Sequence, residues 1–153
     1  MTFNTELKEQ LLKQLNDLLD ERIGASLKAI ESAKEARDND TKSSAGDKYE
    51  TGRAMMQMEL DKHQAQLSKN RALKNELSKI NPSVAMQEAA FGSLLVCNQG
   101  HYLLSVAMGK IRIGQTDVYC LSMLSPLGQA LRGKKAGDEL DFNGQLIQVK
   151  SIV

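Results

Sequence analysis

The stretch Asp38-Asn-Asp-Thr-Lys-Ser-Ser-Ala-Gly-Asp47 decides the fold, because it interrupts a helical pattern that otherwise fills the first half of the chain. Roughly 33 residues on each side of it show the spacing of an amphipathic helix. A short polar segment between two helices of equal length predicts an antiparallel hairpin. At the rise of an α-helix this hairpin is a rod about 50 Å long, with acidic residues in the loop at its far end.

The first helix is predicted over residues 5–37, with Asn4 or Thr5 as its N-cap. Lys34 and Arg37 suit the negative end of the helix dipole. Apolar residues recur at spacings of three and four, which is a helical rather than a strand pattern. They are Leu7, Leu11, Leu15, Leu18, Leu19, Ile23, Leu27, Ile30 and Ala33.

The second helix is predicted over residues 47–79, capped by Ser43 or Ser44. Its heptad-spaced positions form an imperfect seam, because several of them are polar. They are Tyr49, Arg53, Met56, Leu60, His63, Leu67, Asn70, Lys74 and Leu77. The run Met55, Met56 and Met58 is interpreted as flexible core filling.

Beyond Asn81-Pro82 the pattern becomes that of short strands separated by turn residues. Strands are predicted at 93–97, 101–106, 110–113 and 118–121, and a short helix at 126–131 with Ser125 as cap and Pro126 at its first position. Asn143-Gly144 predicts a type I′ hairpin turn between 139–142 and 145–153. Residues 84–90 fit either a short helical turn or a linker.

These elements predict an α+β fold in two parts. Residues 1–80 form the helical hairpin, an antiparallel coiled coil with its tip at about 39–46. Residues 81–153 form a small antiparallel β-sheet domain with a short helix.

Composition excludes several classes of function. The net charge is +1, with 14 basic and 14 acidic side chains in residues 1–80 and 6 and 5 in the remainder, so there is no basic half to attract nucleic acid. Aromatic residues make up 4% of the chain and tryptophan is absent, which argues against base-stacking platforms. No apolar run is long enough for a membrane span or a signal segment. We expect a cytoplasmic monomer with buried free thiols at Cys97 and Cys120.

The C-terminal half resembles one known family. Ser125-Pro-Leu-Gly-Gln-Ala-Leu-Arg-Gly-Lys134, followed by Gly137-Asp-Glu-Leu140, is similar to the C-terminal domain of the Gre transcript-cleavage factors, which bind bacterial RNA polymerase. Phe91-Gly-Ser93 resembles the entry to the first strand of that domain. The long N-terminal hairpin matches the family's layout, so the resemblance covers nearly the whole chain in architecture.

The resemblance implies an FKBP-like C-terminal domain that docks at the rim of the polymerase secondary channel, and a hairpin that enters the channel. It assigns polymerase binding to Ser125, Pro126, Leu127, Arg132, Gly133 and Lys134. It implies that acids at the tip help to hold a second Mg²⁺ in the polymerase active site, where the polymerase cleaves backtracked RNA. The protein is then an accessory with no cofactor of its own, and it acts on the RNA 3′ end only indirectly.

The tip departs from the family signature Asp-x-Lys-Glu-Asn-Ala-Glu-Tyr. Asp40, Lys42, Ala45 and Tyr49 have counterparts, whereas Ser43 replaces the glutamate and the segment is two residues longer. The acids expected to act in trans are Asp40, Asp47 and Glu50, with Asp40 and Asp47 as the ligands of the shared Mg²⁺. Two functions stay open: a factor that stimulates transcript cleavage, and a channel-binding regulator that does not.

Overall fold

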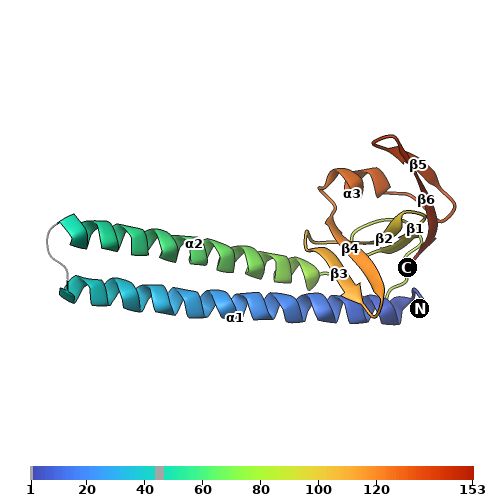
Figure 1. Cartoon of the computed structure of the whole chain (residues 1–153). Coiled ribbons are helices and arrows are strands. Elements are labelled where there is room, and N and C mark those ends of the chain that lie inside the picture. Colours follow the sequence, from blue (N-terminus) through green and yellow to red (C-terminus); the bar gives the residue numbers. More distant parts are fainter. Residues whose placement is uncertain (1, 44–46) are drawn as a thin grey trace. The chain divides into compact units, whose positions relative to one another are not determined.

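The computed structural model describes residues 2–43 and 47–153, and it describes side chains outside residues 40–49. In this part of the chain two long helices come first, followed by a six-stranded sheet with a short helix (Figure 1). The elements are α1 (Thr5–Ser43), α2 (Asp47–Leu77), β1 (Leu94–Cys97), β2 (Gly100–Ser105), β3 (Gly109–Ile113), β4 (Thr116–Ser122), α3 (Pro126–Leu131), β5 (Glu139–Phe142) and β6 (Gln145–Ile152). This is the α+β layout that the sequence predicts.

The chain divides into two compact units. The hairpin unit comprises residues 17–74, which are the greater part of α1 and α2. The globular unit comprises residues 1–16 and 75–153, so the first turns of α1 belong with the sheet.

Helix α1 begins where its cap predicts and ends later than predicted. The Asn4 side-chain oxygen accepts a hydrogen bond from the Leu7 N–H at 2.9 Å, which identifies Asn4 as the N-cap. The helix then continues to Ser43, six residues past the expected end at Arg37. No proline or glycine lies between these positions, and each polar residue there costs a helix only some tenths of a kcal/mol. The expected loop of eight residues was therefore wrong: only residues 44–46 separate the two helices.

The two helices of the hairpin unit run antiparallel. The Lys74 ammonium binds the Asp20 carboxylate near one end, and the Arg37 guanidinium donates to the Gln57 side-chain oxygen at 3.2 Å near the other. Ile30 and Ala33 pack with Leu60 and Leu67 between them.

From Met56 onward the seam of α2 follows the predicted heptads, with Leu60, Leu67 and Asn70 buried and Met56 and His63 half-buried. Arg53 was wrongly placed on the seam, because it is exposed, and the side chain of Tyr49 lies outside the described residues. Buried and half-buried positions on α1 follow the same alternation of four and three residues. They are Leu19, Ile23, Ser26, Ile30, Ala33 and Arg37.

Two interpretations of the hairpin were wrong. Leu27 is 45% exposed, because the heptad phase places Ser26 at the seam instead. Met55 and Met58 are 60% and 71% exposed, so the methionine run is not core filling. Two packed helices bury one narrow stripe each, and only Met56 of the three lies on it.

The sheet has the order β3-β4-β2-β1-β6-β5. Its neighbours are antiparallel except β2 and β4, which pair in parallel with Tyr102 opposite Tyr119. The expected all-antiparallel sheet was wrong at this pair. Strand β3 lies at the outer edge of the sheet and forms an antiparallel hairpin with β4. Strand β4 therefore lies between β3 and β2 and runs in the same direction as β2.

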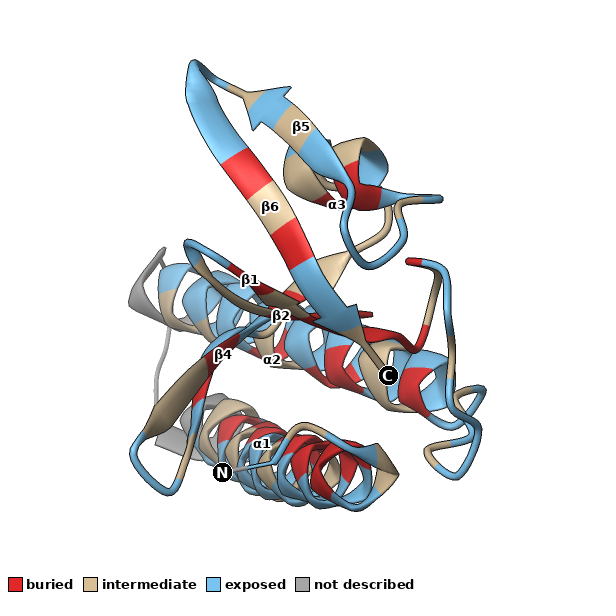
Figure 2. Ribbon diagram, turned by 90° about the vertical axis from the view of Figure 1, so that its right-hand side faces the viewer, coloured by how far each residue is buried: buried red, intermediate tan, exposed pale blue. Residues whose placement is uncertain are grey.

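The sheet's apolar core contains Leu95, Cys97, Tyr102, Leu104 and Leu131, together with Ala89, Ile147 and Val149. Figure 2 shows buried segments of β6 and α3 in red. The hairpin turn between β5 and β6 has positive φ angles at both Asn143 and Gly144, 52° and 80°. This pair of angles confirms the predicted type I′ turn.

The first turns of α1 are tied to the rest of the globular unit. The buried Lys8 ammonium donates to the Val84 carbonyl at 3.0 Å, and the Gln14 amide donates to the Arg112 carbonyl at the edge of β3 at 2.9 Å. Residues 84–90 contain no helix, which leaves the linker reading of that segment. Across the described residues, neither long helix is apolar enough to cross a membrane.

Candidate functional site

The distal end of the hairpin unit holds the acids expected to act at the tip. Asp40 lies in the last turn of α1, Asp47 is the first residue of α2, and Glu50 follows in its first turn with an exposed side chain. The side chains of Asp40 and Asp47 lie outside the described residues, so their assignment as magnesium ligands remains a prediction. Among the described residues no three His, Cys, Asp or Glu side chains gather to hold a metal ion.

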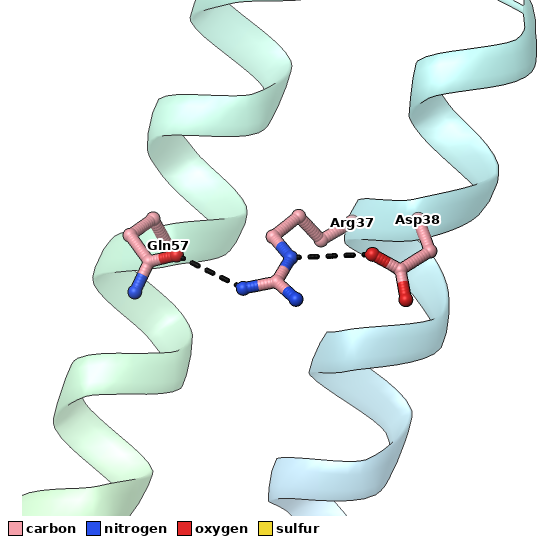
Figure 3. Close-up of polar contacts among 3 residues, drawn as sticks. All are labelled: Arg37, Asp38 and Gln57. Carbon is pink, nitrogen blue, oxygen red and sulfur yellow. Dashed lines mark hydrogen bonds and ion pairs between the residues drawn. The ribbon is translucent and has the colours of Figure 1, made fainter.

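Arg37, three positions before Asp40 on α1, contacts Gln57 of α2 (Figure 3). Its guanidinium donates to the Gln57 side-chain oxygen at 3.2 Å and lies 3.4 Å from a carboxylate oxygen of Asp38. Gln57 in turn donates to the Asp61 carboxylate at 3.0 Å. Sequence reasoning assigned Arg37 to the helix dipole and missed this contact. The signal was present, because Arg37 continues the heptad spacing of the α1 seam.

The Arg37–Asp38 ion pair is largely exposed on the Asp38 side. The Asp38 side chain is 68% accessible and that of Arg37 is 26%. Because solvent screens the exposed carboxylate, the ion pair contributes little to stability. The ion pair places the Asp38 carboxylate beside a cation on the same helix, which offsets part of its negative charge.

The segment expected to bind polymerase begins with a tightly hydrogen-bonded turn. The Ser125 hydroxyl accepts from the Gly128 N–H at 3.0 Å and donates to the Ser122 carbonyl at 2.7 Å. Pro126 occupies the first helical position of α3, and Leu127 packs on the sheet core. Ser125 is therefore the predicted N-cap, and its hydroxyl is occupied within the chain.

Gly128 explains why this turn requires its sequence. A Cβ at this position would lie 2.2 Å from the Ser122 carbonyl oxygen and 2.9 Å from the Ser125 hydroxyl oxygen. No side chain fits there without moving the backbone. The Ser-Pro-Leu-Gly motif thus has a structural reason that is independent of any partner.

The end of the same segment is more accessible. Arg132 and Gly133 are exposed and Lys134 is half-buried. Gly133 has a φ of 81°, and its N–H donates to the Ala89 carbonyl while the Lys134 carbonyl accepts from the Ala89 N–H, both at 2.8 Å. The backbone is held and the two cationic side chains remain available to a partner.

One exposed residue beside this segment was not singled out from sequence. Leu124 is 84% exposed, directly before the Ser125 cap. A leucine in a turn carries no pattern of its own, so only the structure separates it from the buried leucines nearby.

The thiols and histidines do not form a catalytic group. Both cysteines are free and buried, as expected, and burial raises the pKa of Cys97 to about 11 and that of Cys120 to about 12. They therefore stay protonated and unreactive at neutral pH. The His101 ring stacks against Phe3 with centroids 4.5 Å apart, and burial lowers its pKa.

No protein-family model matches the chain, and no curated protein does. A solved structure of the transcription factor Gfh1 is similar to it, with 18% sequence identity over 90% of this chain and 92% of that one and a TM-score of 0.37. Agreement at this level establishes no shared function.

Proposed function

We propose that this protein is an RNA polymerase-binding transcription factor of the Gre type, and that it acts as an accessory rather than as an enzyme. In this proposal the globular unit binds the polymerase and the hairpin enters its secondary channel. The Gre-like residues of the C-terminal half, from Ser125 to Leu140, suggest the class.

The observation that carries the proposal is the form of the hairpin unit. Its two helices pair antiparallel and only residues 44–46 separate them. The part of α1 within this unit, residues 17–43, is about 40 Å long at the rise of an α-helix. A two-helix layer of this length buries little apolar surface for its size. Length without a large core supports a role in reaching into a partner.

The acids at the distal end supply the chemistry in this proposal. A carboxylate presented to an active site helps to hold a second Mg²⁺, which activates water and stabilises the leaving oxygen. In this proposal the chain contributes one or two carboxylates to a magnesium site that the partner holds with its own oxygen ligands. Asp40 and Asp47 are the proposed contributors and Glu50 the third acid.

A second candidate function is a regulator that occupies the channel without stimulating cleavage. Two observations favour it. Ser43 stands where the family signature has glutamate, and the nearby Asp38 carboxylate lies beside the Arg37 guanidinium. Both features reduce the negative charge available to a metal ion.

Binding is tested by a pull-down of core RNA polymerase with the full chain. We expect Arg132→Glu together with Lys134→Glu to abolish retention at moderate salt. The two new carboxylates would be repelled by the acidic surface that we propose on the polymerase. Lys110→Glu with Lys150→Glu is the charge-matched control in the same unit and should bind as wild type. If the wild-type protein is not retained, the proposed class is wrong.

The two functions are separated at the tip. Asp40→Asn and Asp47→Asn should keep polymerase binding, and for a cleavage factor at least one should lose most of the cleavage of stalled transcripts. Glu31→Gln, at an exposed position on α1, is the matched control. A wild-type protein that binds but stimulates no cleavage at any Mg²⁺ concentration is the regulator. Ser43→Glu should then create measurable cleavage. If Ser43→Glu gives no cleavage, the longer tip segment, and not the missing carboxylate, separates this protein from the cleavage factors.

A further inference from the structure

Three methionines lie close together on α2 but have different surroundings. Met55 and Met58 are 60% and 71% exposed, whereas Met56 is half-buried at a heptad position of the seam, four residues before the buried Leu60. Successive residues of an α-helix are about 100° apart, so Met55 and Met58 lie within about 60° of each other on the outer face. The run therefore consists of two thioethers that are open to water and one that lies at the seam.

The other sulfur-containing residues that the structure describes are less accessible. Met86, Met108 and Met123 are half-buried in the globular unit. Both cysteines are buried, and burial raises the pKa of Cys97 to about 11 and that of Cys120 to about 12. Since the thiolate is the form of cysteine that an oxidant attacks, these two thiols react slowly at neutral pH. The two exposed methionines are therefore the sulfur groups that a dissolved oxidant reaches most readily in the described part of the chain.

Oxidation has different consequences at the two kinds of position. A methionine sulfoxide is polar and its oxygen accepts hydrogen bonds. At Met55 and Met58 water can solvate this oxygen without any change in the packing of the two helices. At Met56 the same oxygen would enter the seam beside apolar side chains, where a polar group without a partner is destabilising. The hairpin therefore tolerates oxidation on its outer face and not at its seam.

We propose that Met55 and Met58 form a reversible oxidation site for hydrogen peroxide on the folded hairpin, and that oxidation of Met56 opens the hairpin. In each reaction the thioether sulfur attacks one oxygen of the peroxide. The O–O bond breaks as the S–O bond forms, and the other oxygen leaves as water. The sulfur loses two electrons, which the peroxide gains. A sulfoxide reductase reverses the step with two electrons and two protons from a dithiol, and the oxygen leaves as water.

The test treats the full chain with graded hydrogen peroxide and locates the added oxygen by mass spectrometry. Trypsin cleaves after Arg53 and Lys62 and releases residues 54–62 as one peptide that contains all three methionines. Fragment ions of this peptide compare the three positions directly. Met55 and Met58 should each oxidise about threefold faster than Met56, or more. Equal rates for the three methionines in the folded chain would overturn the proposal.

The same reaction in denaturant is the control for the effect of the fold. The three rates should become equal there, because every thioether of the unfolded chain is open to water. A preference for Met55 and Met58 that persists in denaturant would overturn the proposal, since the neighbouring sequence and not the fold would then select the sites. Sulfoxide reductase with dithiothreitol should return both residues of the oxidised folded chain to methionine. Sulfoxides that resist the reductase would contradict reversibility.

Amide hydrogen exchange within residues 17–74 tests the consequence for the hairpin. Oxidation confined to Met55 and Met58 should leave the exchange rates unchanged, whereas excess peroxide, which also oxidises Met56, should raise them by about tenfold or more. Met56→Leu keeps an apolar side chain at the seam and should retain slow exchange after the same excess. Equal acceleration in Met56→Leu and wild type would overturn the role of Met56. Because polymerase is absent, these outcomes are independent of the proposed transcriptional role.

Discussion

In the globular unit, Leu94, Leu95, Leu103 and Leu104 on neighbouring strands are fully buried, whereas the central cluster of the hairpin keeps between 3% and 9% of each residue exposed. Buried polar residues occur in both units, at Ser26 and Asn70 in the hairpin and at Lys8, Ser93 and Ser105 in the globular unit. The sheet is covered by other elements, while each hairpin helix buries only one stripe. Stability is therefore concentrated in the globular unit, and the hairpin keeps its length at some cost in stability.

The largest expected effect contrasts one leucine from each unit. Leu104→Ala should lower the free energy of unfolding by about 4 kcal/mol, because a fully buried leucine leaves a cavity. Leu67→Ala should cost nearer to about 2 kcal/mol, because Leu67 is partly open to water and the neighbours can close over the gap. Denaturant unfolding of both variants measures the difference. Equal losses would remove the contrast between sheet core and seam.

An alanine substitution at one glycine of each unit tests the same difference in packing between the two units. Gly128→Ala should destabilise the globular unit by about 3 kcal/mol, since the new Cβ would collide with the Ser122 carbonyl. Gly24→Ala, in the middle of α1, meets nothing within 4 Å and should stabilise the hairpin by about 1 kcal/mol. Thermal unfolding of the two variants checks the signs. A neutral Gly128→Ala would contradict the account of the turn before α3.

A third test concerns the buried polar position of the seam. Asn70 is 6% exposed at a heptad position, where a polar residue lowers the stability of a helix pair. Asn70→Leu should raise hairpin stability by about 1 kcal/mol. Amide hydrogen exchange within residues 17–74 measures this directly, with Lys69→Leu at the neighbouring exposed position as control. Faster exchange in Asn70→Leu would show that the asparagine stabilises the seam.

The smallest effect is a pH dependence from Lys8 in the globular unit. Burial lowers the pKa of Lys8 below its model-compound value of 10.5, so the unfolded chain binds the proton more tightly than the folded one. The contribution of Lys8 to the free energy of unfolding therefore rises as pH increases from its pKa in the folded chain toward 10.5. The difference in unfolding free energy between wild type and Lys8→Met should change with pH over this window. A constant difference would mean that Lys8 is as well solvated as a surface lysine.

Local chemistry made much of the fold predictable. The caps at Asn4 and Ser125, the Asn143-Gly144 turn and the heptads of α2 from Met56 onward each depend on neighbours within a few residues, and the structure confirms them. The end of α1 at Ser43 was missed because weakly unfavourable polar residues do not terminate a long helix without a proline or glycine. The parallel pairing of β2 with β4 was missed because strand order depends on contacts distant in sequence.

The candidate sites were less predictable for the same reason. Arg37 faces Gln57 across twenty positions, through a register that no single helix specifies. The cationic residues Arg132 and Lys134 were proposed from sequence because they lie within one local motif, and their role in binding remains a prediction. The acids Asp40 and Asp47 remain predictions from the family resemblance.

The central claim is that the hairpin is long because it must extend into a partner, and shortening it tests this claim most directly. Asp20 lies opposite Lys74 and Arg37 lies opposite Gln57, so in this antiparallel register residues 24–30 lie opposite residues 64–70. Deleting both segments removes one heptad from each helix and keeps the remaining seam residues facing one another. The hairpin becomes about 10 Å shorter. The measurement is transcript cleavage and nucleotide addition by stalled elongation complexes, with helicity and polymerase retention checked in parallel. We predict that the shortened protein folds and binds polymerase but loses whatever effect wild type exerts. A shortened protein that acts as wild type does would contradict the claim.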